Sequence, residues 1–230
     1  MRIDKLLSEL KYVSRSQSRS FMKKHHIMYQ GIRIIDPSFN VDPFLDIYID
    51  EVKLYYNDPI YLALNKPKGY ISATKDQKHP CITDLLKEPY NRFDFSIAGR
   101  LDIDTTGLII LTTDGQFIHE ITHPKKHVDK VYEATLDDVL TFEKSDMLLQ
   151  GVMILDDKKE AYLAKASHIS FEGFSSKITI DEGKFHQVKR MFEAIGYKVL
   201  QLKRIKIGKL LLNDLEEGIY KEIRKEDIFD

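Results

Sequence analysis

The N-terminal thirty residues show the apolar spacing that is typical of short amphipathic helices. The first group of apolar side chains consists of Leu6, Leu7 and Leu10. Asp4 is placed to cap the helix that carries them, and Ser14 is placed to cap a second helix over residues 15–25. That second helix holds its lysines and arginines away from its apolar side chains, so we expect it to present a basic face.

Short stretches of β-forming residues follow this helical region. They lie at residues 27–29, 32–35 and 46–50. After Asn57-Asp58-Pro59, the expected domain boundary, the pattern changes to longer elements. Strands are expected at residues 61–65, 95–98, 108–113, 130–136, 162–170, 176–181 and 199–207. Helices are expected near residues 115–122, 137–149 and 185–195.

Clusters of strands with a few helices between them indicate an α+β fold rather than a doubly wound parallel sheet. We therefore expect two domains. A small N-terminal α/β module is predicted over residues 1–57. A larger domain, with a mixed, mostly antiparallel sheet flanked by helices, is predicted over residues 58–230.

Composition narrows the class of protein. The 230 residues are 43% hydrophobic and 10% aromatic, which is enough to bury a core and excludes a disordered chain. The single cysteine, Cys81, excludes an internal disulfide framework and a thiolate metal cluster, and it fits a reducing compartment. No apolar run approaches the roughly 20 residues that cross a bilayer, and the N-terminus lacks the apolar stretch of a secretion signal. We therefore expect a cytoplasmic protein that does not associate with membranes.

Charge is distributed unevenly, although the formal net charge is only −1. Residues 1–33 carry eight basic side chains against two acidic ones, and residues 184–209 carry eight against one. Between these two blocks, residues 34–60 carry six acidic side chains against one lysine. Two separate basic blocks on a nearly neutral chain favour a localised anionic partner, whereas either block alone is equally consistent with a solvated face.

One zinc motif occurs in the chain and is judged to be accidental. His119, Glu120 and His123 match H-E-x-x-H, in which two histidines on one helical face bind zinc, and Glu143 is available as a further ligand. Pro124 follows the second histidine directly and disfavours helical geometry there. We therefore expect a surface helix that ends at this point, with no metal site.

A polar segment at residues 99–107, GRLDIDTTG, lies between two expected apolar strands. Loops in this position commonly present catalytic groups, whereas an ordinary turn would use aspartate and glycine only for their backbone freedom. An ordinary turn does not require Arg100, nor the further polar side chains Asp104, Thr105 and Thr106. The segment is therefore a candidate catalytic loop.

A second candidate segment, at residues 182–191, reads EGKFHQVKRM. An apolar stripe that is expected to face the core consists of Phe185, Val188, Phe192 and Ile195. His186, Lys189 and Arg190 lie on the other side of the expected helix. Basic groups next to a carboxylate loop would keep that carboxylate ionised and could also bind a phosphate, whereas the simpler interpretation is a plain amphipathic helix.

Taken together, five segments identify a family resemblance. NKPKG, AGRLDIDTTGLIILTTDG, HP followed by KVYEA, EGKFHQVKRMF and LKRIKIG occur in this order. The order and spacing resemble the RsuA-type pseudouridine synthases over residues 60–228. The first fifty residues resemble the S4-like RNA-binding domain that precedes the catalytic domain in this family, although HHIMYQG at residues 25–31 and the acidic stretch at 36–51 depart from the usual pattern.

The resemblance implies three catalytic residues. Asp102, in GRLD, matches the essential catalytic aspartate of the family. Tyr132, in KVYEA, matches the aromatic residue that stacks on the target base and can act on its proton. Lys189 matches the basic residue that pairs with the aspartate, and Arg190 is the alternative for that position.

The resemblance also implies a set of residues that bind the substrate. They are Arg100, Arg190, Lys66, Leu202 and Arg204. Arg100 would help to flip or hold the nucleotide, and Lys66 belongs to a motif whose role is mainly structural. The basic N-terminal residues expected to contact RNA phosphates are Arg2, Lys5, Arg15, Arg19, Lys23 and Lys24.

The implied activity is the isomerisation of a uridine to pseudouridine in ribosomal RNA by base flipping and a catalytic aspartate. The DxDTTGL sequence after GRL indicates 16S RNA of the small subunit. The reaction involves no redox change, so no cofactor and no metal are expected. Attack of the aspartate on the sugar and elimination through a glycal both stay open. A non-catalytic RNA-binding or ribosome-assembly factor is the alternative, and a monomer is expected.

Overall fold

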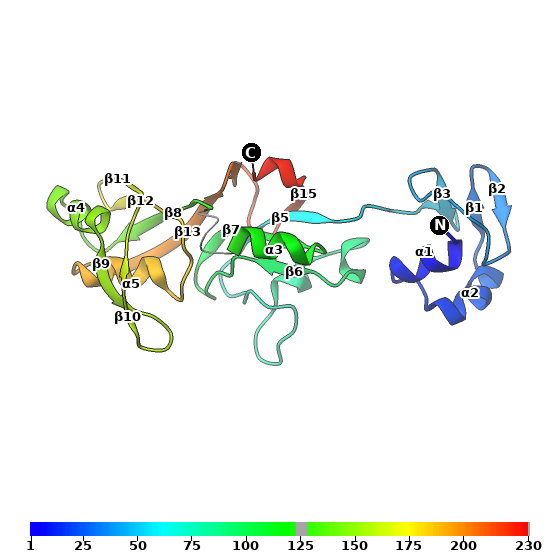
Figure 1. Cartoon of the computed structure of the whole chain (residues 1–230), viewed down its shortest axis with the longest axis horizontal. Helices are drawn as coiled ribbons and strands as arrows, with labels where there is room; N and C mark the ends of the chain where they lie inside the picture. Colours follow the sequence, from blue (N-terminus) through cyan, green and yellow to red (C-terminus); the bar gives the residue numbers. More distant parts are fainter. Residues whose placement is uncertain (123–127, 230) are drawn as a thin grey trace. The chain divides into compact units, whose positions relative to one another are not determined.

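The computed structural model describes residues 1–122 and 128–229 (Figure 1). Contacts within the chain divide it into two compact units. Unit 1 comprises Met1–Asp58 and Leu86–Asp94, and unit 2 comprises Pro59–Leu85 and Phe95–Asp230.

Several contacts hold the later segment of unit 1 there, among them the ion pair of Lys11 with Asp94 at 3.0 Å and the contacts of Arg92. The guanidinium of Arg92 lies 3.8 Å from the ring centre of Tyr12 and donates to the carbonyl of Leu10 at 3.2 Å. The expected boundary at residue 57 takes no account of this return of the chain, because hydropathy patterns report local elements only.

Unit 1 packs its helices against a four-stranded antiparallel sheet in the order β2-β1-β3-β4. Its elements are α1 (Ile3–Glu9), a 3₁₀ turn (Arg15–Gln17), α2 (Ser18–Lys24), β1 (Ile27–Tyr29), β2 (Ile32–Ile34), β3 (Ile47–Ile49) and β4 (Val52–Lys53). The apolar face of α1 meets the sheet in a core that includes Ile3, Leu6, Leu7, Met22, Ile27 and Ile47.

Neither of the expected helix caps in unit 1 forms. The N-cap of α1 is Arg2, and Asp4 lies in the first turn, where its carboxylate accepts hydrogen bonds from the Arg2 guanidinium at 2.7 and 3.1 Å. Ser14 precedes the 3₁₀ turn, but its hydroxyl donates to the side chain of Gln17 at 2.7 Å instead of accepting from a backbone amide. Both side chains have other polar partners, and α2 begins at Ser18 rather than at residue 15.

Unit 2 is built on a nine-stranded sheet with the order β11-β12-β8-β13-β7-β5-β15, to which β14 and β6 are added at β13 and β7. The strands and helices in the first half of the unit are β5 (Tyr61–Lys66), β6 (Ser96–Ala98), β7 (Thr106–Thr112), α3 (Gly115–Thr122), β8 (Lys130–Leu136) and α4 (Phe142–Gln150). Those in the second half are β9 (Val152–Leu155), β10 (Ala161–Ala164), β11 (His168–Glu172), β12 (Ser175–Ile180), α5 (Gln187–Ala194), β13 (Val199–Ile207), β14 (Leu210–Leu211) and β15 (Tyr220–Glu222). Among the described strands, β13 pairs in parallel with β7 and the other pairings are antiparallel. The expected α+β class with a mostly antiparallel sheet is therefore confirmed.

One expected strand, over residues 162–170, is wrong. The chain forms two strands there: β10 pairs with β9 in a separate two-stranded sheet, and β11 pairs with β12 in the large sheet. Strand β9 alternates buried and exposed residues, so it packs one face against α5 and leaves the other face in solvent. The helix expected from residue 137 begins at Phe142, because Thr141 caps it by accepting a hydrogen bond from the amide of Lys144 at 3.3 Å.

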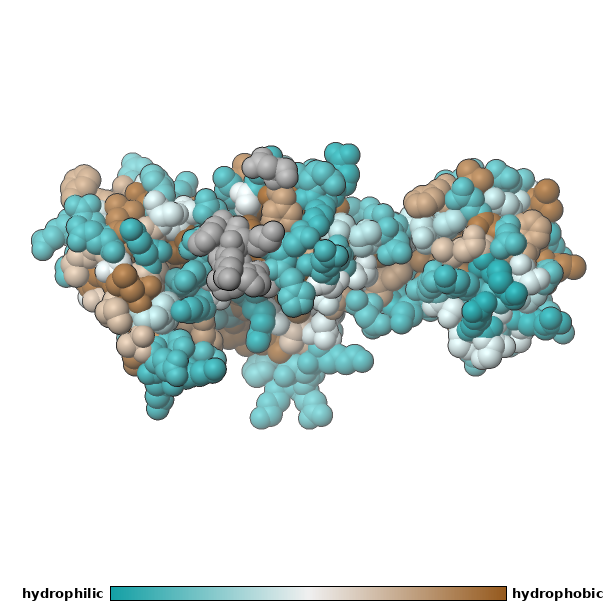
Figure 2. Space-filling view, in the orientation of Figure 1, coloured by the Kyte–Doolittle hydropathy of each residue, from teal (hydrophilic) through white to brown (hydrophobic). Residues whose placement is uncertain are grey.

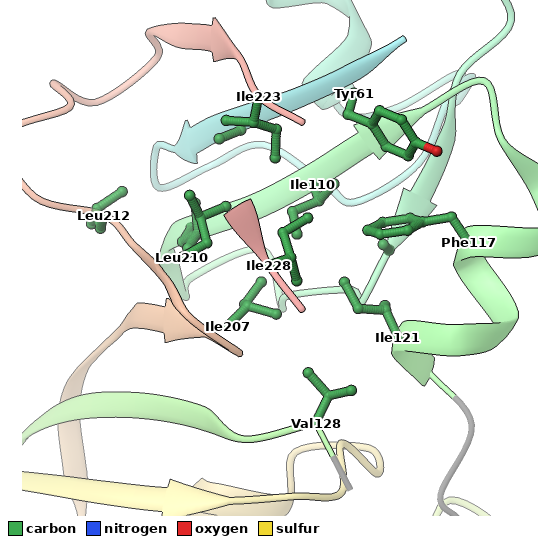
Figure 3. Close-up of a cluster of buried hydrophobic side chains, with 13 residues drawn as sticks. Tyr61, Ile110, Phe117, Ile121, Val128, Ile207, Leu210, Leu212, Ile223 and Ile228 are labelled. Carbon is green, nitrogen blue, oxygen red and sulfur yellow. The ribbon is translucent and has the colours of Figure 1, made fainter. Parts of the chain in front are cut away.

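The strands β5 and β7 lie inside unit 2. Six of the seven residues of β7 are buried, as expected for a strand covered on both faces. Figure 3 shows the apolar cluster on one of these faces, where Ile110 of β7 and Tyr61 of β5 lie near Phe117 and Ile121 of α3. The cluster also contains Ala98 of β6, so this packing holds β6 and β7, the strands that lead into and out of the candidate catalytic loop.

The face shown in Figure 2 is largely hydrophilic, with scattered apolar patches. One group of exposed apolar side chains lies on α4, β9 and β10, and it includes Phe142, Met153, Leu155 and Leu163. Of the helices in the described part of the chain, none has the length and apolar character that a membrane span needs.

Candidate active site

The loop of residues 99–105, between β6 and β7, carries Asp102 and is tied down by β5 and the turn after it. Lys66, at the end of β5, is fully buried, and its ammonium group donates to the carbonyl of Thr105 at 2.8 Å and to two other backbone carbonyls. Burial lowers the pKa of Lys66 to about 8. The hydroxyl of Ser72 donates to the carbonyl of Leu101 at 2.7 Å and accepts from its amide at 2.9 Å. The NKPKG motif therefore acts mainly as the support of this loop.

The carboxylate of Asp102 lies between two basic side chains at the start of α5. One oxygen is 3.2 Å from Nε2 of His186, and the other is 3.2 Å from the ammonium nitrogen of Lys189. The side chains of Asp102 and Lys189 are 25% and 24% exposed, so the ion pair is only partly solvated. A partly buried pair of this kind is electrostatically stronger than one at the surface.

Lys189 is shared with a second carboxylate. Its ammonium group donates to Oδ1 of Asp104 at 2.6 Å, which is closer than its contact with Asp102. Burial raises the pKa of Asp104, but the hydrogen bond and the charge of Lys189 outweigh burial and leave that pKa below its usual range. Lys189 therefore bridges the two aspartates of the loop.

The first residues of α5 depart from the expected apolar stripe. Val188, Phe192 and Ile195 are buried as predicted, but Phe185 is 49% exposed and lies before the helix. Its ring stacks on that of His186 with a centroid separation of 3.7 Å. His186 occupies the N-cap position with a φ of 52°, and this left-handed backbone directs the chain into the helix. The prediction for Phe185 is therefore wrong, because the helix begins later than residue 185.

Arg204 is buried beneath the loop. It is 1% exposed, and its guanidinium donates to the carbonyls of Leu108 at 2.7 Å and Gly99 at 2.6 Å. It also donates to the hydroxyl of Tyr132 at 3.3 Å. One buried cation thus joins β13, the start of the Asp102 loop, strand β7 that follows the loop, and the tyrosine of β8.

Two hollows meet at Asp102. The larger, here named the Asp102 cleft, has a volume of about 620 Å³ and is lined by residues that include Arg100, Asp102, Lys184, His186 and Lys189. A narrower gap of about 40 Å³ separates Asp102 from Tyr132. Such a gap holds only a few water molecules, so a ring in contact with Tyr132 would require it to widen.

The structure brings most of the expected site residues together. Asp102, Tyr132, Arg100 and Leu202 line the narrow gap. Lys189 lines the Asp102 cleft. Lys66 and Arg204 lie behind the loop and contact backbone carbonyls. Arg190 does not join Asp102, because its guanidinium contacts the carbonyl of Leu155 and lies 4.9 Å from the ring centre of Phe185.

The six expected RNA-binding residues all lie at the surface of unit 1. Arg2 and Lys5 have acidic partners on α1, Asp4 at 2.7 Å and Glu9 at 3.5 Å. Arg15 lies 3.6 Å from Asp4. The other three, Arg19, Lys23 and Lys24, are exposed on α2. The basic face predicted for the second helix therefore exists, and it is centred on α2.

Three residues of the site were not among the individually expected site residues, although His186 and Asp104 were noted as polar members of the two candidate segments. His186 contacts Asp102, Asp104 shares Lys189, and Lys184 lines the cleft. For His186 a signal was present, since it precedes Lys189 by three residues and so lies on the same helical face. For Asp104 and Lys184 the sequence shows only that charged residues are present in the two candidate segments, and no spacing indicates their partners.

The zinc motif has no support in the described residues. No group of three or more histidine, cysteine or acidic residues that could hold a metal occurs within residues 1–122 and 128–229. Glu120 pairs instead with Lys225 at 2.6 Å. His123 and Pro124 lie outside the described residues.

Comparison with known proteins assigns the two units. The family model described as RNA pseudouridylate synthase matches residues 60–194, and the S4 domain model matches residues 1–47. The ribosomal small subunit pseudouridine synthase A of Yersinia pestis is 36% identical, over 99% of this chain and 97% of its own length. An uncharacterized RNA pseudouridine synthase of Bacillus subtilis is 39% identical, over 99% of this chain and 97% of its own length.

A solved structure agrees with these sequence matches. The crystal structure of a pseudouridylate synthase aligns with a TM-score of 0.67 and 35% identity, over 99% of this chain and 98% of the other. The expected resemblance is confirmed over both units, and this chain belongs to the RsuA-type family of pseudouridine synthases that carry an S4 domain.

Proposed function

We propose that this protein isomerises one uridine to pseudouridine in RNA of the small ribosomal subunit, in the cytoplasm and as a monomer, with Asp102 as the catalytic carboxylate. The observation that carries the proposal is the position of this carboxylate, partly exposed in a cleft, between Lys189 and His186 and across a narrow gap from Tyr132. The names of the relatives support the ribosomal substrate. We propose residues 1–57 as the RNA-binding domain and residues 58–230 as the catalytic domain.

The chemistry breaks the bond between N1 of uracil and C1′ of ribose, rotates the base, and forms a bond from C5 to C1′. The proton on C5 is lost and N1 gains one, so substrate and product are isomers. Asp102 either attacks C1′ or removes the proton of C2′ to give a glycal, and both routes need it ionised. The ammonium of Lys189 and the imidazole of His186 stabilise that charge and fix its position.

Tyr132 is proposed to stack on the uracil and to take the proton from C5 in the second half of the reaction. Its hydroxyl accepts a hydrogen bond from the buried Arg204, which fixes the orientation of the ring. Because the gap beside Tyr132 has a volume of only about 40 Å³, it must widen as the flipped base enters. Lys66 and Arg204 act through the backbone that they hold, and Leu202 forms an apolar wall.

Replacement of Asp102 by Asn tests the proposal. The variant keeps the shape of the side chain but removes its charge, so we expect normal folding and RNA binding with turnover reduced by at least about 10³-fold. Tritium release from RNA labelled at C5 of uridine measures turnover. The control is Asp146→Asn, because Asp146 is an exposed aspartate on α4 away from the cleft, and it should retain nearly full activity. Turnover by Asp102→Asn near that of the control would reject Asp102 as the catalyst and favour a non-catalytic binding role.

A further inference from the structure

A second hollow in unit 2 adjoins the site and takes no part in the reaction described above. It has a volume of about 450 Å³, which lies in the range of pockets that bind small ligands, and we name it the β13 trough. Strand β13 pairs with β7 at Lys203 and Arg204, and the residues before this pairing, Val199–Leu202, line the trough along the strand. The trough therefore opens where β7 and β13 diverge.

Polar side chains from neighbouring strands form one wall of the trough. Gln201 of β13 pairs with Thr135 of β8, and Lys203 pairs with Glu133. Ser175 of β12 continues the row beyond Thr135. Successive residues of a strand point to opposite faces, so these side chains share one face of the sheet. The lining is mainly polar, as suits a ligand with hydrogen-bonding edges.

The trough is continuous with the Asp102 cleft. Asp104 and Lys189 line both hollows, and Leu202 lines both the trough and the narrow gap beside Tyr132. A chain of nucleotides with one base at Asp102 would therefore place a neighbouring nucleotide at the trough.

Two lysines of the trough are available to a phosphate group. Within the part of the chain that the structure describes, the ammonium groups of Lys68 and Lys203 have no acidic partner within ion-pair distance. Lys189, by contrast, is engaged by two aspartates. Free ammonium groups that line a hollow are suited to the backbone phosphate of RNA.

The acidic residues of the trough favour one class of base. Glu133 and Glu217 present carboxylates, which accept hydrogen bonds but do not donate them. Cytosine, adenine and guanine carry amino groups that donate to a carboxylate, whereas uracil presents carbonyl oxygens at the corresponding edge. Glu133 is only weakly engaged, since its nearest cation, Lys177, is 4.0 Å away.

From this geometry we infer that the β13 trough binds the nucleotide next to the target uridine, with its phosphate at Lys68 and Lys203 and its base edge at Glu133, and that it prefers a base with an exocyclic amino group. The inference rests on the proposed function for the identity of the RNA. The trough would thus contribute to the choice of uridine by reading its neighbour, in addition to the cleft that takes the uridine itself.

Binding of single nucleotides to the full chain tests the trough without any need for turnover. We expect cytidine 5′-monophosphate to shift the amide NMR signals of Gln201 and Lys203, and uridine 5′-monophosphate to shift them less at equal concentration. Glu133→Gln should weaken the binding of cytidine 5′-monophosphate about fivefold or more. Glu193→Gln, on the exposed face of α5, should leave the affinity for this nucleotide unchanged. Unmoved signals at Gln201 and Lys203, or equal responses to both nucleotides, would overturn the inference.

A second arm uses RNA fragments in which the neighbours of the modified uridine are varied. Lys203→Ala should raise KM severalfold with little change in kcat, and Lys198→Ala, from the same basic block but outside the trough, should not. Glu133→Gln should abolish the preference for an amino-bearing neighbour. If the unaltered protein modifies no uridine, the proposed function fails, and the nucleotide titration still tests whether the trough binds a base with an amino group. If it modifies uridine with no effect of the neighbour or of Lys203, only the trough inference fails.

Discussion

Gly107 lies where β7 passes directly beside β13, and we predict that it tolerates no side chain. A Cβ atom placed there would be 2.2 Å from the carbonyl oxygen and 2.7 Å from the amide nitrogen of Arg204, and the backbone φ is +104°. Both neighbours are backbone atoms of the paired strand, so they cannot move without separating β7 from β13. Gly107 also pairs with Lys66 on its other side, so the support of the Asp102 loop would shift as well.

The loss of unfolding free energy expected for Gly107→Ala has two parts, backbone strain and steric clash. The same substitution at a second glycine, Gly69, measures the strain alone. Gly69 also has a positive φ, +90°, but a Cβ atom at this residue would have nothing within 4 Å, so Gly69→Ala introduces backbone strain alone. That strain should cost about 1–2 kcal/mol of unfolding free energy. At Gly107 the clash adds overpacking of about 2–3 kcal/mol, for a total near 4 kcal/mol.

Urea denaturation followed by circular dichroism measures the difference. With an m-value of about 2 kcal/mol per molar urea, Gly107→Ala should lower the midpoint of unit 2 by about 2 M and Gly69→Ala by less than about 1 M. The m-value itself should be unchanged. If the two variants lost equal stability to within about 0.5 kcal/mol, the argument from close approach of the strands would be refuted.

Two further predictions concern the buried lysine and the basic helix. The pKa of Lys66 in the fold, about 8, is below that of an unfolded lysine, so burial of its charge destabilises the fold fully below pH 8 and progressively less up to about pH 10.5. The free energy of unfolding of the unaltered protein should therefore rise between about pH 8 and about pH 10.5. Urea titrations at these two pH values should show that Lys66→Met reduces this rise by up to about 3 kcal/mol. Replacement of Arg15, Arg19 and Lys23 by Ala should weaken RNA binding and lower its salt slope by up to about 2–3.

Each of these predictions has a matched control. Lys68→Met, at an exposed lysine two residues from Lys66, should leave the pH dependence of stability unchanged, and an equal change in both variants would contradict the role of burial. Lys53→Ala removes a lysine of unit 1 that is paired with Asp46 at 2.6 Å, so it should leave the salt slope as it is. A triple variant whose binding keeps the full salt slope would show that the α2 face does not contact the RNA.

Much of the fold was predictable because its signals are local. The strands at residues 130–136 and 199–207 have the predicted bounds, since each is a run of β-forming residues that is flanked by breakers. The pattern failed where a run covered two elements, as at residues 162–170, because a change of partner strand leaves no mark in hydropathy. It failed also at the caps of unit 1, where the neighbouring side chains of Arg2 and Gln17 took the hydrogen bonds of Asp4 and Ser14 in place of the backbone amides.

The sequence by itself determined which segments are candidates for the chemistry: GRLD and HQVKR contain polar residues that strands and turns do not need, and KVYEA was identified by its resemblance to the family. Only the tertiary structure decided how these residues are paired. Asp104 and Lys189 are 85 positions apart, and Arg204 is 105 positions from the carbonyl of Gly99 that it holds. The contacts of Arg204 follow from the parallel pairing of β7 with β13, and the contact of Asp104 follows from the position of α5 beside the loop; no spacing along the chain encodes either. Periodicity reports the face on which a side chain lies, whereas the partner it meets there depends on which distant strand the sheet brings alongside.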